Sequence, residues 1–150
     1  MQRLANKVAL ISGAARGIGA ATAKKMAAEG AAVVIGDILD DRARQTVQEI
    51  EAAGGKATFA HLDVTSEASW QAAIDAATGA YGKLDILVNN AGIFIGRDIE
   101  DATLEEWHKL VAINLTGVFL GTKLAIPALK AAGEASKHGS AIVNLSSVAG

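Results

Sequence analysis

Apolar positions along the chain follow two alternating patterns. Short, nearly continuous apolar runs, typical of strands covered on both faces, predict strands at Lys7–Ser12, Ala32–Asp37, Lys56–Leu62, Leu84–Asn89 and Ser140–Ser146. Longer Ala-rich stretches with helical spacing predict helices at Gly17–Glu29, Asp40–Ala53, Ser66–Tyr81 and Thr103–Ala132. This alternation predicts an α/β fold, a doubly wound parallel sheet with helices on both faces, formed by residues 1–150 as one domain.

The predicted helix ends carry recognisable signals. Thr103 and Glu106 are spaced as a capping box at the start of the last helix, and Pro127 is expected to bend that helix. Glycines follow the helices as expected C-terminal stops; they are Gly30, Gly54, Gly55, Gly82 and Gly133.

The composition argues against several classes of partner and of active site. The 150 residues are 51% apolar and 20% charged, with a net charge of -2 and no basic cluster, which argues against nucleic acid and anionic membranes as partners. No apolar stretch approaches the roughly 18 uninterrupted residues of a membrane helix. The absence of cysteine excludes cysteine zinc sites and thiol nucleophiles, and favours a cytoplasmic location.

A glycine-rich turn joins the first strand to the first helix. Its glycines are Gly13, Gly17 and Gly19, in the spacing GxxxGxG. We expect a tight turn at Gly13, close approach of a pyrophosphate at Gly17, and close helix packing at Gly19. The helix N-terminus would face the phosphate with its partial positive charge. Such a turn also occurs simply to close a connection, so the turn alone does not establish a ligand.

Asp37 ends the second predicted strand, where a carboxylate can accept hydrogen bonds from both ribose hydroxyls of an adenosine. It would repel a 2′-phosphate, which favours NAD(H) over NADP(H). Arg16, in the turn, could instead pair with a 2′-phosphate, although it is also read as a solvated charge. NAD(H) is therefore the predicted cofactor, with NADP(H) as the alternative.

Several short motifs, in this order, resemble those of the short-chain dehydrogenase/reductase family. They are SGAARGIG from Ser12 to Gly19, Asp37, LDV from Leu62 to Val64, NNAG from Asn89 to Gly92, INLTG around Asn114, and VNLSS ending at Ser147. The resemblance covers the whole chain and implies a Rossmann-type fold, hydride transfer between nicotinamide and a secondary alcohol or ketone, and a homo-oligomer, either a tetramer or a dimer.

The resemblance also implies roles for individual residues. Ser147 would hold the substrate oxygen, and Asn114 would support a water in the proton relay. The cofactor-binding set would be Gly13, Arg16, Gly17, Ile18, Gly19, Asp37, Asp63, Val64, Asn90, Ala91, Gly92 and Ile113. The Asn90–Gly92 segment has a second interpretation as a tight turn, and Ile113 a second interpretation as core packing.

The family's acid/base tyrosine, in a YxxxK motif, has no counterpart in this sequence. Tyr81 is the only tyrosine and lies far earlier in the fold. We therefore expect the C-terminal part of the family fold, with its Tyr and Lys, to lie beyond Gly150. The alternative is a catalytically inactive nucleotide-binding module that regulates or supports a partner.

Other conspicuous side chains receive structural interpretations. The spacing of His61, His108 and His138 suits no common metal. Trp70 and Trp107 are expected to pack in the core or against another subunit. The last helix is apolar on more than one face, which favours a subunit interface. The segment Ile93–Ile95 is compatible with an apolar substrate pocket and equally with core packing; the particular alcohol cannot be read.

Overall fold

The computed structural model describes residues 2–147, and in them five parallel strands form one sheet in the order β3-β2-β1-β4-β5. The strands are β1 (Val8–Ser12), β2 (Ala32–Asp37), β3 (Lys56–His61), β4 (Ile86–Asn89) and β5 (Ala141–Asn144). The predicted sheet is confirmed. Chain order reverses between β1 and β4, and in open α/β sheets this reversal opens a crevice at the carboxyl ends of the strands.

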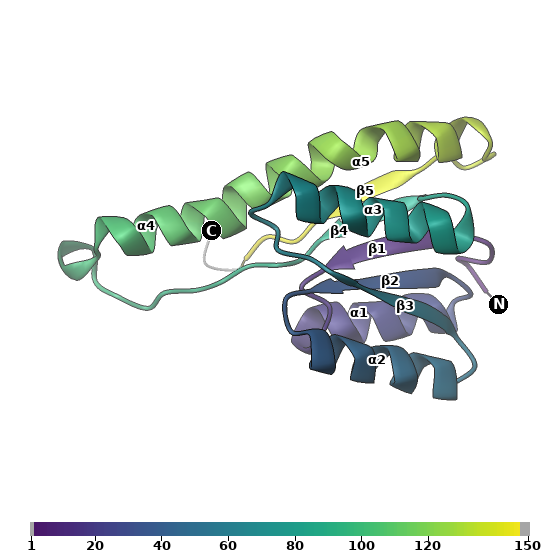
Figure 1. Ribbon diagram of the computed structural model, residues 1–150, viewed down its shortest axis with the longest axis horizontal. Helices are drawn as coiled ribbons and strands as arrows, with labels where there is room; N and C mark the ends of the chain where they lie inside the picture. Colours follow the sequence, from purple (N-terminus) through teal and green to yellow (C-terminus); the bar gives the residue numbers. More distant parts are fainter. Residues whose placement is uncertain (1, 148–150) are drawn as a thin grey trace.

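Helices cover both faces of the sheet, as predicted (Figure 1). One core cluster lies between the sheet and two helices, α1 (Gly17–Ala28) and α2 (Asp40–Ala52). The other lies beneath α3 (Glu67–Tyr81) and α5 (Gly117–Glu134), with the fully buried Trp70 at its centre. The apolar strands β1 and β2 are buried along their whole length because both faces are covered.

The last predicted helix, Thr103–Ala132, is one continuous helix in the structure, Leu104–Glu134, with a π-helical turn inside it. A short 3-10 turn (Ile99–Asp101) precedes α4 (Leu104–Val111), and a π-helical turn (Ala112–Thr116) joins α4 to α5. The capping box at Thr103 is confirmed, and Pro127 lies within α5. Gly133 is not a stop, since α5 continues to Glu134.

Asn114 lies in the π-helical turn and pairs with a segment outside the helix. Its Oδ1 accepts a hydrogen bond from the Ile93 N–H and its Nδ2 donates to the Ile93 carbonyl, both at 2.8 Å. The side chain is therefore committed to a segment outside the helix. A π turn accommodates an extra residue in a helix and occurs often at functional sites.

The stretch Leu104–Glu134 is long and apolar enough to cross a membrane by length and composition alone. Its most apolar window has a mean hydropathy of 1.5 and is 22% buried. Core helices of soluble proteins pass the same test, so this measure does not by itself assign a membrane span.

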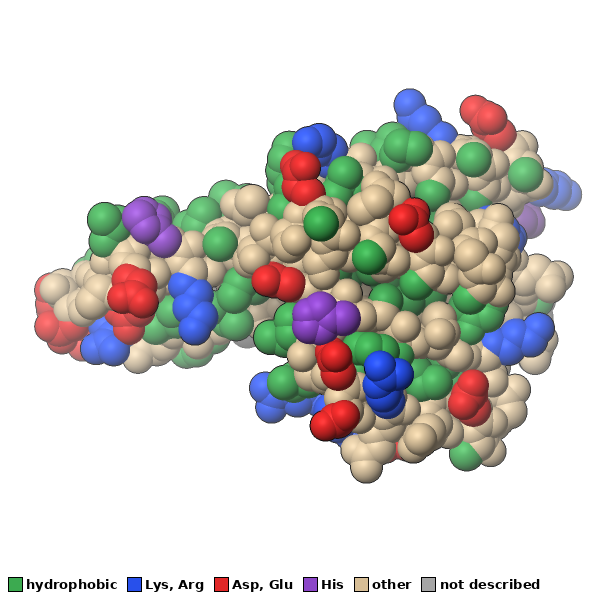
Figure 2. Space-filling view, viewed as in Figure 1, with side chains coloured by type: hydrophobic (Ala, Val, Ile, Leu, Met, Phe, Trp, Pro, Cys, Tyr) green, Lys and Arg blue, Asp and Glu red, His purple; other side chains and the backbone are tan. Residues whose placement is uncertain are grey.

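The α4 arm, defined here as residues 92–116, extends away from the body of the molecule (Figure 1). Apolar side chains lie along it in Figure 2, between charged groups. Phe94 is 86% exposed. Trp107, which the sequence predicts to pack in the core or against another subunit, is 60% exposed. Within the described chain, these apolar groups are therefore left largely in contact with solvent.

A buried carboxylate links the amino ends of the neighbouring strands β1 and β4. Asp85, just before β4, is fully buried and accepts a hydrogen bond from the Val8 N–H at 2.9 Å. Lys7 and Lys83 pair with it at 3.2 and 3.0 Å. Burial raises the pKa of Asp85, but the hydrogen bonds from Lys83, Val8 and Lys7 outweigh it, so the net pKa is lowered.

Candidate functional site

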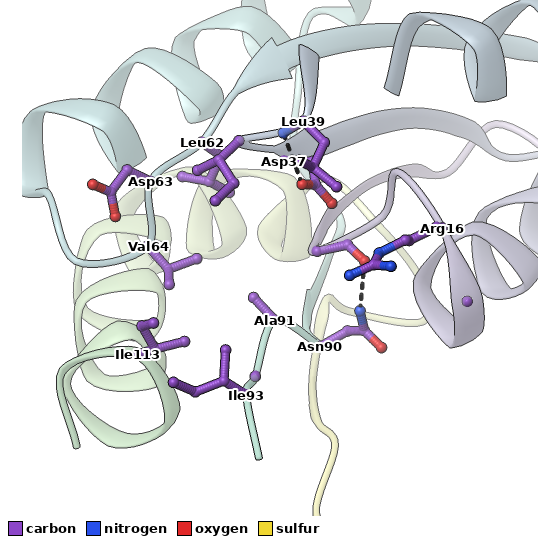
Figure 3. Close-up of a pocket in the computed structure, with 14 residues that line it drawn as sticks. Arg16, Asp37, Leu39, Leu62, Asp63, Val64, Asn90, Ala91, Ile93 and Ile113 are labelled. Atoms are coloured by element: carbon purple, nitrogen blue, oxygen red, sulfur yellow. Dashed lines mark hydrogen bonds between the residues drawn. The ribbon is translucent and has the colours of Figure 1, made fainter. Parts of the chain in front are cut away.

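A pocket of about 420 Å³ lies at the carboxyl ends of β1 to β4 (Figure 3). The structure brings ten of the predicted cofactor residues to its wall: Gly13, Arg16, Gly17, Asp37, Asp63, Val64, Asn90, Ala91, Gly92 and Ile113. Four further residues complete it, namely Ile38, Leu39, Leu62 and Ile93. The predicted Ile18 and Gly19 are not part of this wall.

Close packing fixes the shape of the glycine turn. Gly13 has a φ of +65°, and a Cβ there would lie 2.8 Å from the Ala91 Cα. At Gly19 a Cβ would overlap the Gly13 carbonyl, so this glycine lets α1 start directly against the turn. A Cβ added at Gly17 would meet no other segment within 4 Å, so this side of the backbone is open to an approaching group. Ile18 is 69% exposed beside it.

Hydrogen bonds at Ser12 hold the glycine turn against the segment after β4. The Ser12 Oγ is buried and accepts hydrogen bonds from the N–H groups of Asn90 and Ala91, each at 3.0 Å. In return, the Asn90 Nδ2 donates to the carbonyls of Ser12 and Gly13 at 2.9 Å. The sequence analysis did not single out Ser12; the signal available was a serine at the end of an otherwise apolar strand.

Asp37 is held in place at the end of β2. The residue is 8% exposed; its Oδ2 accepts from the Ala15 N–H at 2.9 Å and its Oδ1 from the Leu39 N–H at 3.0 Å. A carboxylate has about four lone-pair sites, so each oxygen can still accept another hydrogen bond from the pocket. The exposed Arg16 lines the same pocket from the glycine turn.

The opposite wall is apolar. Leu62 and Val64 come from the segment after β3, and Ile113 comes from the π-helical turn, with their side chains toward the cavity (Figure 3). Between them, the Asp63 Oδ1 accepts hydrogen bonds from the N–H and the hydroxyl of Thr65, at 2.9 and 2.7 Å. A flat apolar group with polar edges fits between such walls.

The two residues with predicted catalytic roles lie outside the pocket wall. Asn114 is one residue beyond Ile113 and pairs with the backbone of Ile93, which does line the pocket. Ser147 is exposed and follows β5, at the carboxyl edge of the sheet that also carries the pocket. The structure thus places both predicted residues on segments adjoining the pocket.

Tyr81 lies elsewhere, at the C-terminal end of α3. Burial, with a smaller contribution from the charge of Glu51, raises its pKa. Among residues 2–147 no group of three or more His, Asp or Glu side chains could hold a metal ion. The polar groups of the described pocket are backbone amides, the carboxylates of Asp37 and Asp63, the Arg16 guanidinium and the Asn90 amide, and they face an apolar wall.

Comparison with known proteins identifies the family. The short chain dehydrogenase family profile matches residues 7–150. The chain belongs to this family. The glycine turn, Asp37 and the segment Asn90–Gly92 thus lie at one pocket in a chain that belongs to this family.

Curated relatives of this short-chain dehydrogenase include several named for their substrates. The trans-4-hydroxycyclohexanecarboxylate dehydrogenase of Sinomonas cyclohexanicum is 51% identical over 99% of this chain and 57% of its own length. The 2,5-dichloro-2,5-cyclohexadiene-1,4-diol dehydrogenase of Sphingobium indicum is 52% identical, again over 99% and 57%. The 3-alpha-(or 20-beta)-hydroxysteroid dehydrogenase of Mycobacterium tuberculosis is 49% identical over 99% and 54%. The chain thus spans a little over half the length of these relatives.

Proposed function

We propose that the full-length protein containing this chain is an NAD-dependent oxidoreductase that transfers a hydride between nicotinamide and a secondary alcohol or ketone. The observation that carries the proposal is the Asp37 carboxylate, fixed by two backbone N–H groups at the wall of a pocket that the glycine turn also lines. Such a carboxylate can accept both ribose hydroxyls of NAD, and its charge opposes the 2′-phosphate of NADP.

The remaining groups of the pocket fit the other parts of a dinucleotide. The open backbone at Gly17, at the start of α1, offers N–H groups and a positive helix end to a pyrophosphate. Leu62 and Val64 offer an apolar surface to the adenine ring. The bound nicotinamide supplies the hydride chemistry.

Residues of this chain would orient the substrate around that cofactor. By family resemblance, Ser147 donates a hydrogen bond to the substrate oxygen and stabilises the charge that develops there. By the same resemblance, the backbone carbonyl of Asn114 in the π-helical turn would hold a water, while its side chain pairs with the backbone of Ile93. The Tyr and Lys of the acid/base pair are proposed to lie beyond Gly150.

The proposed substrates are alcohols of carbocyclic compounds. The relatives above are named for a hydroxylated cyclohexane, a cyclohexadienediol and a hydroxysteroid. The segment after Ala91 begins with Gly92–Ile95, in which Phe94 is exposed and Ile93 and Ile95 are half-buried, and its apolar side chains would contact such a ring. We do not propose the inactive nucleotide-binding module, because no observation favours it and these relatives are named as dehydrogenases.

Titration of the full-length protein with NADH and NADPH tests the cofactor assignment, with oxidation of cyclohexanol as the accompanying turnover assay. We expect NADH to bind more tightly than NADPH. Asp37→Ala should weaken NADH binding about 10- to 100-fold, because hydrogen bonds to a charged group are lost, and should leave NADPH binding unchanged or stronger. Preferential binding of NADPH by the unmodified protein would show that the cofactor assignment is wrong.

Asp41→Ala provides a matched control for this titration. Asp41 lies in the first turn of α2, is exposed, and is not part of the pocket wall. It removes a carboxylate four residues from Asp37 and should leave NADH binding unchanged. Equal losses in the two variants would attribute the effect to general electrostatics rather than to a ribose contact.

We propose that the α4 arm packs against a second copy of the protein in a cytoplasmic homotetramer or dimer, rather than against lipid. The α4 arm carries Glu105 and Lys109, and α5, which continues from it, carries Lys123 and Lys130; charges of this kind are costly inside a bilayer. An apolar surface interrupted by charges suits a subunit interface. Sedimentation velocity of the soluble fraction should show a dimer or tetramer; a monomer, or recovery only in membranes, would contradict the proposal.

A further inference from the structure

An amide pair joins the ends of the last two strands. Asn89 is the final residue of β4 and Asn144 the final residue of β5, and the two are directly in register. The Asn89 Nδ2 donates to the Asn144 Oδ1 at 2.8 Å and to the Thr122 Oγ1 on α5 at 3.3 Å. The pair therefore supplements the backbone ladder at the carboxyl edge of the sheet.

The Asn89 side chain is held in a confined position. The residue is 3% exposed, and its Oδ1 has no hydrogen-bond partner within residues 2–147. It faces α5 at Gly121, where a Cβ would lie 2.7 Å from this oxygen and 2.6 Å from the Trp70 ring. Burying an unpaired acceptor costs stability, which an apolar side chain would avoid. Strand stability alone therefore does not explain an asparagine at this position.

Both asparagines stand next to segments with proposed roles. In the segment after β4, the first residue that lines the pocket is Asn90, directly after Asn89. Ser147 lies three residues after Asn144, in a segment that β4 also holds through the Leu145 N–H to the Asn89 carbonyl at 3.0 Å. Residue 89 thus contacts the serine-bearing segment through its backbone and, through its side chain, the residue that ends β5.

We propose that Asn89 and Asn144 are positioning residues for Ser147, an inference that rests on the proposed function. Their amide pair fixes the end of β5, at the edge of the described sheet, to the strand that carries the cofactor pocket. The serine hydroxyl is thereby kept at a constant position relative to the nicotinamide end of that pocket. Loss of the pair should slow hydride transfer while leaving cofactor binding intact.

Asn144 is the residue to change, because it is exposed and its replacement leaves the core untouched. In the full-length protein, Asn144→Ala removes the acceptor of the amide pair, whereas the matched Asn144→Asp retains an oxygen that accepts from the Asn89 Nδ2. We expect Asn144→Ala to lower kcat about 10- to 100-fold, the scale of a small misplacement of a catalytic group. Asn144→Asp should stay near the unmodified rate.

Two accompanying measurements separate positioning from general damage. The dissociation constant for NADH should be nearly unchanged in Asn144→Ala, since the pocket wall lacks this residue. The melting temperature should fall only slightly, since the buried Asn89 Nδ2 keeps its hydrogen bond to the Thr122 Oγ1. In a Ser147→Ala background, Asn144→Ala should cause little further loss of kcat, because the two residues act through one hydroxyl.

The outcomes that would overturn the inference are distinct from failure of the proposed function. An unchanged kcat in Asn144→Ala, with a large loss in Ser147→Ala, would remove the positioning role and leave the function standing. Equal losses in Asn144→Ala and Asn144→Asp, or a parallel loss of NADH affinity, would also remove it. Full turnover by Ser147→Ala would overturn the serine's role and this inference together.

Discussion

Replacing Ser147 by alanine in the full-length protein is expected to lower kcat about 10²- to 10³-fold, the typical cost of removing one donor that stabilises charge at a reacting oxygen. The affinity for NADH should not change, because Ser147 is not part of the pocket wall. Stopped-flow absorbance of NADH formation with a secondary alcohol measures the step directly.

The neighbouring serine provides the control for this prediction. Ser146 is also exposed, two residues after the end of β5, and its replacement removes a hydroxyl one position before Ser147. We expect Ser146→Ala to retain the unmodified kcat. If both variants turned over normally, the catalytic assignment of Ser147 would be wrong; a loss confined to Ser146→Ala would move the assignment to that residue.

Asp85→Asn is expected to destabilise the protein by about 3 kcal/mol, the lower end of the cost of removing one partner of a buried ion pair. The carboxylate is fully buried, and the substitution leaves Lys7, whose side chain is 19% exposed, without its ionic partner. Urea unfolding followed by circular dichroism measures the difference. Lys83→Met is the control: Lys83 is 39% exposed, so a loss below about 1 kcal/mol is expected.

The effect of Asp85 should depend on pH in a defined direction. Because its pKa is lowered in the folded state, its contribution is fully present above the unfolded value of about 3.9 and is lost as the pH falls through the folded value. The stability gap between the unmodified protein and Asp85→Asn should therefore be constant at neutral pH and shrink below about pH 4. A gap that widened on acidification would contradict the lowered pKa.

Local patterns were sufficient to predict most of the fold. β2 has the predicted bounds, and α1 and α2 each end one residue earlier than predicted, because apolar runs and terminal glycines act locally. The long predicted helix is continuous in the structure from Leu104 to Glu134, but its helical spacing gave no sign of the π-helical turn within it, which is accompanied by a contact of Asn114 with Ile93 on a distant segment. A pairing of that kind has no local sequence pattern.

The same distinction applies to the site. Gly13 and Asp37 were predicted because a strand-ending glycine and a strand-ending carboxylate have recognisable positions along the chain. The roles of Ser12 and Asn89 were not predicted, since each depends on which strands become neighbours, β1 with β4 and β4 with β5.

The strand order has a consequence for how the chain assembles as it is synthesised. β2 pairs with β1, β3 with β2, β4 with the free side of β1, and β5 with β4. Each new strand therefore joins an edge that already exists, and none has to be inserted between two strands that have already paired. N-terminal segments fold first during synthesis, so on a ribosome this sheet can grow outward from β1 on both sides without reopening any earlier pairing.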